Sequence, residues 1–241
     1  MELDEYGRVA AAEDDHWWYR GIRDVARLWL RPWLASPRRI LDAGCGPGGN
    51  GAWLASHGAL VGVDVNREAL RFVQMRWPTT APVCGDIALL PFRDDSFDVA
   101  LVVTVLYAVK DDELALRELA RVVAPGGAVL VVEPAFESLR REHDATVHGL
   151  RRYRRSTLLT RVQDHGFSVR RASYAYSFLA PPAAILAGLS RLRHRRGTSA
   201  SDVERRGLDV VFDPLARLER AWLAHHDVRF GTSVMVLATR P

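Results

Sequence analysis

The sequence is poor in the residues that hold small secreted domains together or anchor a chain in a membrane. Its two cysteines, Cys45 and Cys84, give neither a disulfide framework nor the spacing of a metal site. No apolar run approaches the roughly 18 residues that a membrane-spanning helix needs. The first residues include Glu2, Asp4 and Glu5, where a secretory signal would be basic. We therefore expect a cytoplasmic protein without a membrane span.

Lysine is almost absent too, because Lys110 is the only one among 33 basic residues. The basic charge is concentrated in two segments, Arg140 to Arg155 and Arg191 to Arg206, each with six arginines and two acids. Each segment has a net charge of +4, equal to that of the whole chain, so the remainder is acidic. A local excess indicates a patch rather than a general affinity for polyanions.

Strand-like and helix-like segments alternate through the first 135 of the 241 residues. The apolar runs RRILDAG, ALVGVDV, FDVALVVTVL and GGAVLVVEP are typical of strands, and GNGAWLASHG, REALRFVQMRW and DDELALRELARVV have helical spacing. This alternation predicts βαβ units and a parallel sheet covered on both faces, in one α/β domain. Beyond it we expect a helix ending at Gly166, a strand, two helices that start with prolines, and a last strand.

The segment LDAGCGPGGNGAWL carries the chemistry. Glycines at positions 44, 46 and 48 directly follow a strand and precede a helical segment. Glycine allows a tight turn and a close approach of the backbone to a ligand, and free N–H groups at a helix start favour polar or anionic groups. Asp64 ends the next strand, where a carboxylate can accept hydrogen bonds from both hydroxyls of a ribose.

These residues resemble the first motif of the class I methyltransferases that use S-adenosylmethionine, D-x-G-x-G-x-G after a strand. A dinucleotide site usually reads G-x-G-x-x-G instead. The segments VGVDVN, CGDIALLPF, DDSFDVALVVTVL and LRELARVVAPGGAVLVVEP match later parts of the family pattern in order, so the resemblance covers residues 38–135. It implies a Rossmann-like, doubly wound, mostly parallel seven-stranded sheet.

The resemblance also implies the organisation of the chain around that core. Residues 1–37 would form an N-terminal helical lid, and residues 38–135 the core that binds S-adenosylmethionine. Residues 136–241 would supply the acceptor pocket, a helical insertion before the last strand, and the closing strands of the same domain.

Roles for individual residues follow from the resemblance as expectations. Asp42 would lie near the ammonium group of the cofactor, Gly44 to Gly46 beneath its methionine portion, and Asp64 at its ribose. Asp86 and the backbone of Ile87 would hold the adenine. The full set of expected cofactor contacts in the core is Asp42, Gly44, Cys45, Gly46, Gly48, Asp64, Val65, Asp86, Ile87 and Thr104. Tyr107 stands where relatives often carry histidine, and we assign it to acceptor binding.

The stretch HDATVHGLRRY follows the fifth strand, where this family usually builds its acceptor pocket. It is similar to a stretch of a bacterial branch that also begins with H-W-W. We predict His143 or His148 as a general base, with Tyr153 as a further catalytic residue. Arg151 and Arg152 would hold an anionic group of the acceptor. The alternative, a solvated helix start with structural histidines, stays open.

No metal site is expected in this stretch, because His143, Asp144 and His148 have no strong further ligand nearby in sequence.

The stretch EDDHWWYRGIRD, residues 13–24, concentrates aromatic and basic residues near the start. On a helix, Trp18, Ile22, Val25 and Trp29 form one apolar stripe, so we expect Trp18 in the core. Trp17 would line the pocket, beside the space left by Gly21. The neighbouring face carries Tyr19, Arg20 and Arg23, which we expect at the cofactor carboxylate or at an anionic acceptor.

These features predict a methyltransferase that acts on a small-molecule or peptide acceptor in biosynthetic or natural-product metabolism. Oxygen, in a carboxylate or a hydroxyl, is the preferred methyl acceptor, and S-adenosylhomocysteine would be the product. The alternatives are an RNA methyltransferase, and an N-methyltransferase of an amine or sugar. No nucleic acid is expected as a partner, because the basic charge is local and no RNA-binding module is evident.

Residues 178–196 read as an apolar helix followed by arginines. A lid, a core helix and a helix at a membrane surface all fit this pattern, and the oligomeric state stays open.

Overall fold

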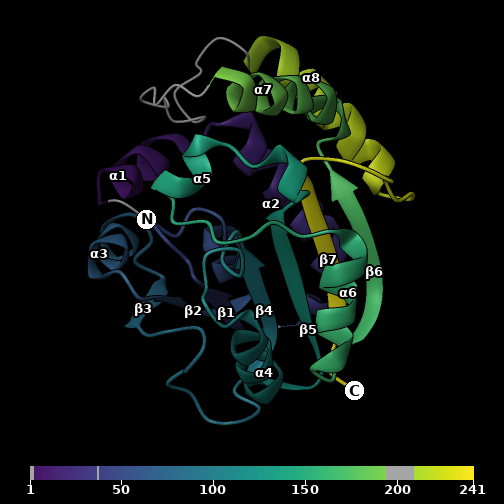
Figure 1. Cartoon of the computed structure of the whole chain (residues 1–241). Helices are drawn as coiled ribbons and strands as arrows, with labels where there is room; N and C mark the ends of the chain where they lie inside the picture. Colours follow the sequence, from purple (N-terminus) through teal and green to yellow (C-terminus); the bar gives the residue numbers. More distant parts are fainter. Residues whose placement is uncertain (1–2, 37, 194–208) are drawn as a thin grey trace.

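A single seven-stranded sheet organises the protein, in the order β3-β2-β1-β4-β5-β7-β6 (Figure 1). The structure is a computed structural model that describes residues 3–36, 38–193 and 209–241. The strands are β1 (Arg38–Ala43), β2 (Gly58–Asp64), β3 (Thr80–Cys84), β4 (Phe97–Val103), β5 (Val123–Pro134), β6 (Ser168–Ala175) and β7 (Ser233–Thr239). Strands β1 to β5 pair in parallel, and β7 runs antiparallel between β5 and β6.

Helices cover both faces of this sheet. They are α1 (Leu3–Ala12), α2 (Trp17–Leu30), α3 (Arg67–Arg76), α4 (Asp112–Val122), α5 (Glu142–Thr146), α6 (Arg155–Asp164), α7 (Ala180–Arg193) and α8 (Asp209–Leu223). Short 3-10 turns lie at η1 (Arg31–Trp33), η2 (Ala52–His57), η3 (Glu137–Leu139) and η4 (Ser177–Leu179). Figure 1 shows α4 and α6 in front of the sheet, α2 behind it, and α7 and α8 together beyond its upper end.

The strand order reverses direction between β1 and β4. From β1 the chain proceeds outward to β2 and β3, and it then returns to place β4 on the other side of β1. In a doubly wound sheet this switch leaves a crevice outside the carboxyl ends of the two strands, where ligands bind. The glycine segment and Thr104 follow these two strand ends, so the topology places both at the crevice.

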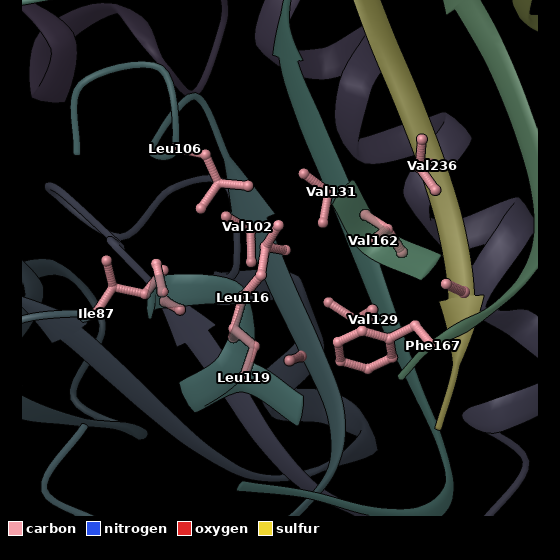
Figure 2. Packing of buried hydrophobic residues seen from close by; sticks show 14 of the residues in the cluster. Ile87, Val102, Leu106, Leu116, Leu119, Val129, Val131, Val162, Phe167 and Val236 are labelled. Atoms are coloured by element: carbon pink, nitrogen blue, oxygen red, sulfur yellow. The ribbon is translucent and has the colours of Figure 1, made fainter. Parts of the chain in front are cut away.

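Two apolar clusters hold the layers together, one on each face. In front, Leu116 and Leu119 of α4 pack with Val102, Val129 and other side chains of the sheet (Figure 2). On the other face, α2 and α8 pack against β1, β4, β5 and β7. The sheet is therefore buried on both sides, which explains the near-continuous apolar runs of its parallel strands.

The predicted fold class is confirmed: a seven-stranded, mostly parallel sheet with helices on both faces and a helical insertion, α7 and α8, before the last strand. Three details differ. The strand β3 was not among the strand-like runs of the sequence, because it has no strong apolar pattern. It contains Pro82, which an edge strand tolerates. GNGAWLASHG contains the 3-10 turn η2 instead of an α-helix, and Pro214 lies inside α8 instead of at its start. No helix of the described residues is long and apolar enough to cross a membrane.

The packing of α4 gives a test of the core. Leu116 is fully buried, whereas Leu114, two residues earlier on the same helix, is about one-third exposed. We expect Leu116→Ala to lower the free energy of unfolding by about 2–5 kcal/mol, because it leaves a cavity. The matched change Leu114→Ala should cost only about 0.5 kcal/mol. Urea denaturation of both variants measures the difference, and equal losses would contradict the assigned face.

Candidate active site

One cavity of about 670 Å³ lies at the carboxyl ends of β1, β2 and β4. Its volume falls in the usual range for small-molecule sites, roughly 300–1,000 Å³. At one end it is lined by the glycine segment, Asp64 and Asp86, and at the other by side chains of α2, α5, η4, α7 and α8. The cavity therefore joins the predicted cofactor site to the predicted acceptor region.

The turn after β1 depends on Gly44. Its φ is +75°, and a Cβ there would lie 2.4 Å from a methyl carbon of Val105. The N–H groups of Gly44 and Cys45 donate to the carbonyl of Val63, at 2.7 and 2.8 Å. The N–H of Gly46 donates to Oδ2 of Asp64 at 2.9 Å. These bonds hold the glycine loop against the end of β2, so that Gly44, Cys45, Gly46 and Asp64 all line the cavity.

Three carboxyl groups lie buried around this loop. Burial raises the pKa of Asp42 to about 8, reinforced by the charges of Glu13 and Asp64 and opposed by the N–H of Gly51. Burial also raises the pKa of Glu13 and of Asp64, against hydrogen bonds from Arg76 to Glu13 and from backbone N–H groups to Asp64. This concentration of buried acids favours a cationic ligand.

The adenine side of the predicted site contains the other expected residues. Asp86, Ile87, Val65 and Thr104 all line the cavity. Asp86 accepts a hydrogen bond from the N–H of Ala88 at 2.8 Å, which fixes the turn that carries Ile87. Two expected residues, Asp42 and Gly48, do not line the cavity. Gly48 instead packs against Trp77, which a Cβ would approach to 2.8 Å, and the buried Asp42 lies against Gly51.

Tyr107 lines the acceptor end of the cavity, in the loop after β4. The fully buried carboxyl group of Glu133, on β5, accepts hydrogen bonds from the N–H groups of Val105, Leu106 and Tyr107, at 2.8 to 3.1 Å. This carboxyl group fixes the loop that carries Tyr107. Burial raises the pKa of Tyr107 and of Tyr19, which lies across the cavity, so both phenols are hydrogen-bond donors at neutral pH.

The two adjacent tryptophans differ in burial. Trp17 is buried and packs against Tyr176, Phe178 and Phe212, while Trp18 is only half-buried and packs against the same core cluster, so the expected placing of Trp18 in the core is met only in part. Both side chains line the cavity. The space beside Gly21 is filled by Tyr176, whose hydroxyl donates to the carbonyl of Trp18 at 2.5 Å. The rest of the apolar stripe is buried as predicted.

Arg20 and Arg23 do not line the cavity, contrary to their predicted roles as cofactor contacts. Arg20 pairs with Asp213 of α8 at 2.8 Å. Arg23 is buried and donates to the carbonyl groups of Glu13 and Asp14, at 2.5 and 2.9 Å. Both arginines therefore fix the position of α2 instead of facing a ligand.

The predicted acceptor residues Arg151 and Tyr153 also lie outside the cavity lining. The buried hydroxyl of Tyr153 donates to Asp112 at 2.5 Å, and Arg151 pairs with the same carboxylate at 2.6 Å. Their assignment to catalysis and acceptor binding was wrong, because the hydroxyl of Tyr153 and the guanidinium of Arg151 both bond to Asp112, at the start of α4. A carboxylate 41 residues earlier was not foreseeable from local spacing.

Arg152 does line the cavity, but its guanidinium is occupied. The Nε and Nη2 groups of Arg152 donate to the two carboxylate oxygens of Asp144, at 2.8 and 3.0 Å. Burial opposes ionisation of Asp144, yet these hydrogen bonds hold its pKa below the ordinary value. The pair forms a fixed wall beside His148 and Arg141, which also line the cavity. The backbone of His143 lies in α5, but its side chain is outside the described residues.

Three of the six arginines in the first basic segment form ion pairs within the molecule. Arg140 pairs with Glu137, Arg151 with Asp112 and Arg152 with Asp144. These pairs reduce the charge that suggested a binding patch in the sequence, which weakens the alternative of a nucleic-acid substrate.

Sequence reasoning missed two residues of α1 and the segment after it. The phenol of Tyr6 and the carboxyl of Glu13 line the cavity, and burial raises the pKa of Tyr6 to about 12. The N–H of Gly49 donates to Glu13 at 3.0 Å, and Arg76 also contacts this carboxylate. The only signal was the acidic run before His16, which gives no hint of a contact with the glycine segment.

The contacts of Tyr153 predict a structural role. Tyr153→Phe removes one buried hydrogen bond to a carboxylate and should lower the free energy of unfolding by about 1–3 kcal/mol. Binding of S-adenosylhomocysteine, measured by calorimetry, should stay unchanged because the hydroxyl does not face the cavity. A stable variant with lost methyl transfer would contradict this role.

Comparison with known proteins agrees with the geometry. Residues 41–131 match a family model described as "Methyltransferase domain". The chain is 38% identical over 137 residues to a malonyl-[acyl-carrier protein] O-methyltransferase of Erwinia billingiae, covering 56% of this chain and 53% of that protein. It is 35% identical over 114 residues to a demethylmenaquinone methyltransferase of Streptomyces griseus, covering 45% and 50%. The chain spans about half the length of these curated relatives.

The fold has close parallels among solved structures. An S-adenosylmethionine-dependent methyltransferase of Mesorhizobium loti superposes with a TM-score of 0.62 at 17% identity, covering 95% of this chain and 100% of that one. The matched segment contains the glycine loop, Asp64 and β4, which form the cofactor end of the cavity. Residues 41–131 are therefore similar to a methyltransferase domain, and the chain shares the fold of this solved structure.

Proposed function

We propose that this protein transfers a methyl group from S-adenosylmethionine to an oxygen atom of a small-molecule or peptide acceptor in biosynthetic metabolism. The observation that carries this proposal is the continuous cavity that joins the glycine loop to the space lined by α2, α5 and α7. A continuous space of this kind lets an acceptor meet a bound cofactor away from bulk water.

The residues at the cofactor end fit S-adenosylmethionine. Asp64 uses each oxygen for one backbone N–H, of Gly46 and of Asn66, and keeps further lone pairs for the ribose hydroxyls. The open φ > 0 turn at Gly46, where a Cβ would meet no atom within 4 Å, leaves room beside the loop for the methionine portion. The buried acids Glu13 and Asp42 favour the positive charges of the ligand.

When bound, S-adenosylmethionine supplies a methyl group already activated by a positively charged sulfur. The protein therefore has to orient the acceptor and exclude water. Tyr19 and Tyr107 offer phenol donors to an acceptor oxygen, and Trp17 and Phe212 cover the cavity with apolar surface. A carboxylate acceptor needs no base, whereas a hydroxyl acceptor must lose a proton, for which His148 is the described candidate.

Oxygen is supported as the acceptor atom by the similarity to the Erwinia relative, which is named an O-methyltransferase. The test is transfer of labelled methyl groups to two acceptor panels, dicarboxylic acyl thioesters and hydroxylated aromatic compounds. The variant His148→Gln should slow transfer to hydroxyls at least about tenfold, because general bases contribute this much or more. It should leave transfer to carboxylates nearly unchanged. Transfer to amines alone would refute the oxygen assignment.

The cofactor site predicts a large effect of Asp64. Asp64→Ala should weaken S-adenosylhomocysteine binding at least about tenfold, because it removes a charged hydrogen-bond acceptor worth roughly 1.5–3 kcal/mol per bond. Asp164→Ala, an exposed acid at the end of α6, is the matched control and should bind like the parent. Calorimetry measures both affinities. Unchanged binding by Asp64→Ala would show that the ribose lies elsewhere.

The raised pKa of Asp42 predicts that cofactor affinity depends on pH. With a pKa of about 8, this carboxyl group is mostly protonated at pH 6.5 and mostly ionised at pH 8.5. A cationic ligand stabilises the ionised form, so the affinity for S-adenosylmethionine should rise several-fold from pH 6.5 to pH 7.5, below the pH of about 8 at which the ligand's own ammonium group loses its proton. In Asp42→Asn the dependence should flatten. Calorimetric titrations at several pH values test this, and an affinity that falls as the pH rises would contradict the assignment.

A further inference from the structure

Helix α1 contributes to the lining of the cavity. Tyr6 and Val9 both lie on its wall, and Tyr6 is only 6% exposed. The helix packs against α3, and Arg76 of α3 pairs with Glu13 and Asp14 in the segment that follows α1. The N-terminal helix is therefore held beside the glycine loop, with one side facing the space where a ligand would bind.

The phenol of Tyr6 lies among the polar groups at the end of β2. Burial, followed by the charge of Asp64, raises the pKa of Tyr6 to about 12, and a hydrogen bond with the side chain of Asn66 opposes this rise. Tyr6 and Asp64 line the same cavity. The phenol therefore keeps its proton at neutral pH and lies within electrostatic reach of the carboxylate that fits the ribose.

Tyr6 and Asp64 have complementary hydrogen-bonding chemistry. An ionised carboxylate can only accept, and Asp64 already accepts from the N–H groups of Gly46 and Asn66, at 2.9 and 2.8 Å. A ribose hydroxyl that donates its proton to Asp64 still has lone pairs on its oxygen, and these lone pairs need a donor. A protonated phenol supplies the donor that the carboxylate cannot.

We infer that Tyr6 is a cofactor-binding residue, which donates a hydrogen bond from its phenol to a ribose hydroxyl of S-adenosylmethionine. The inference rests on the proposed function, because it takes the cofactor end of the cavity as the site of this ligand. The segment that matches the methyltransferase domain starts at residue 41, so it assigns nothing to α1. With Tyr6 at the ribose, the N-terminal helix becomes part of the cofactor site.

The test is calorimetric titration of the full chain with S-adenosylhomocysteine and with its 2′-deoxy and 3′-deoxy analogues. Tyr6→Phe removes only the hydroxyl, and it should weaken the binding of S-adenosylhomocysteine about threefold to tenfold, as expected for the loss of one hydrogen bond. For one of the two deoxy analogues the parent and Tyr6→Phe should bind equally, because the oxygen that accepts from the phenol is gone.

Tyr153→Phe is the matched control, because it makes the same change at a buried phenol outside the cavity lining. It should bind all three ligands like the parent. A second measurement needs no substitution and decides the question if Tyr6→Phe does not fold. Binding of S-adenosylhomocysteine should slow amide hydrogen exchange in the peptide that covers α1 of the parent chain, because the ligand stabilises the helix that contacts it.

Three results would overturn the inference and leave the proposed function intact. The first is an unchanged affinity of Tyr6→Phe for S-adenosylhomocysteine. The second is an equal loss of affinity for all three ligands, which would make Tyr6 a residue that positions Asp64 instead of a ribose contact. The third is hydrogen exchange in α1 that the bound ligand does not slow. A parent chain that binds neither S-adenosylmethionine nor S-adenosylhomocysteine would instead refute the proposed function, and the inference with it.

Discussion

The burial of acidic groups at the carboxyl ends of β1 and β2 is the constraint that shapes this site. Asp42 is the last residue but one of β1, Asp64 ends β2, and Glu13 reaches the same loop from the segment after α1. Hydrogen bonds from backbone N–H groups and from Arg76 stabilise the ionised carboxylates only in part. Burial therefore still raises the pKa of all three carboxyl groups. A cationic ligand bound at this site would reduce the repulsion that remains between these carboxylates.

The same constraint explains how the N-terminal segment is attached. Glu13 bonds to Gly49, and its carbonyl accepts from Arg23 of α2. The glycine loop, α1 and α2 are thus joined through one residue, and α2 in turn packs on α8. Cofactor end and acceptor end of the cavity are therefore coupled by a short chain of polar contacts, from the loop after β1 to the insertion before β7.

The cofactor end was predictable from sequence and much of the acceptor end was not. Gly44 and Asp64 follow from local rules, because a tight turn after a strand requires glycine and strand ends meet at one sheet edge. Arg152 and Tyr153 were assigned through a resemblance of the stretch after the fifth strand, and their partners Asp144 and Asp112 decide their roles. Trp17 and Trp18 differ in burial because of Tyr176, Phe178 and Phe212, which come from the far end of the chain.

This asymmetry has a physical origin. The turn at the cofactor end is built from neighbours in sequence, and its backbone N–H groups can only lie where the turn places them. The acceptor end is assembled from α2, the loop after β4, α5, η4, α7 and α8, which come together only in the tertiary fold. Its side chains find their partners among residues from all of these elements. An arginine or tyrosine beside a buried carboxylate bonds to that carboxylate and has a structural role. The phenols of Tyr19 and Tyr107, by contrast, line the cavity and stay protonated, because burial and the charges of nearby carboxylates raise their pKa.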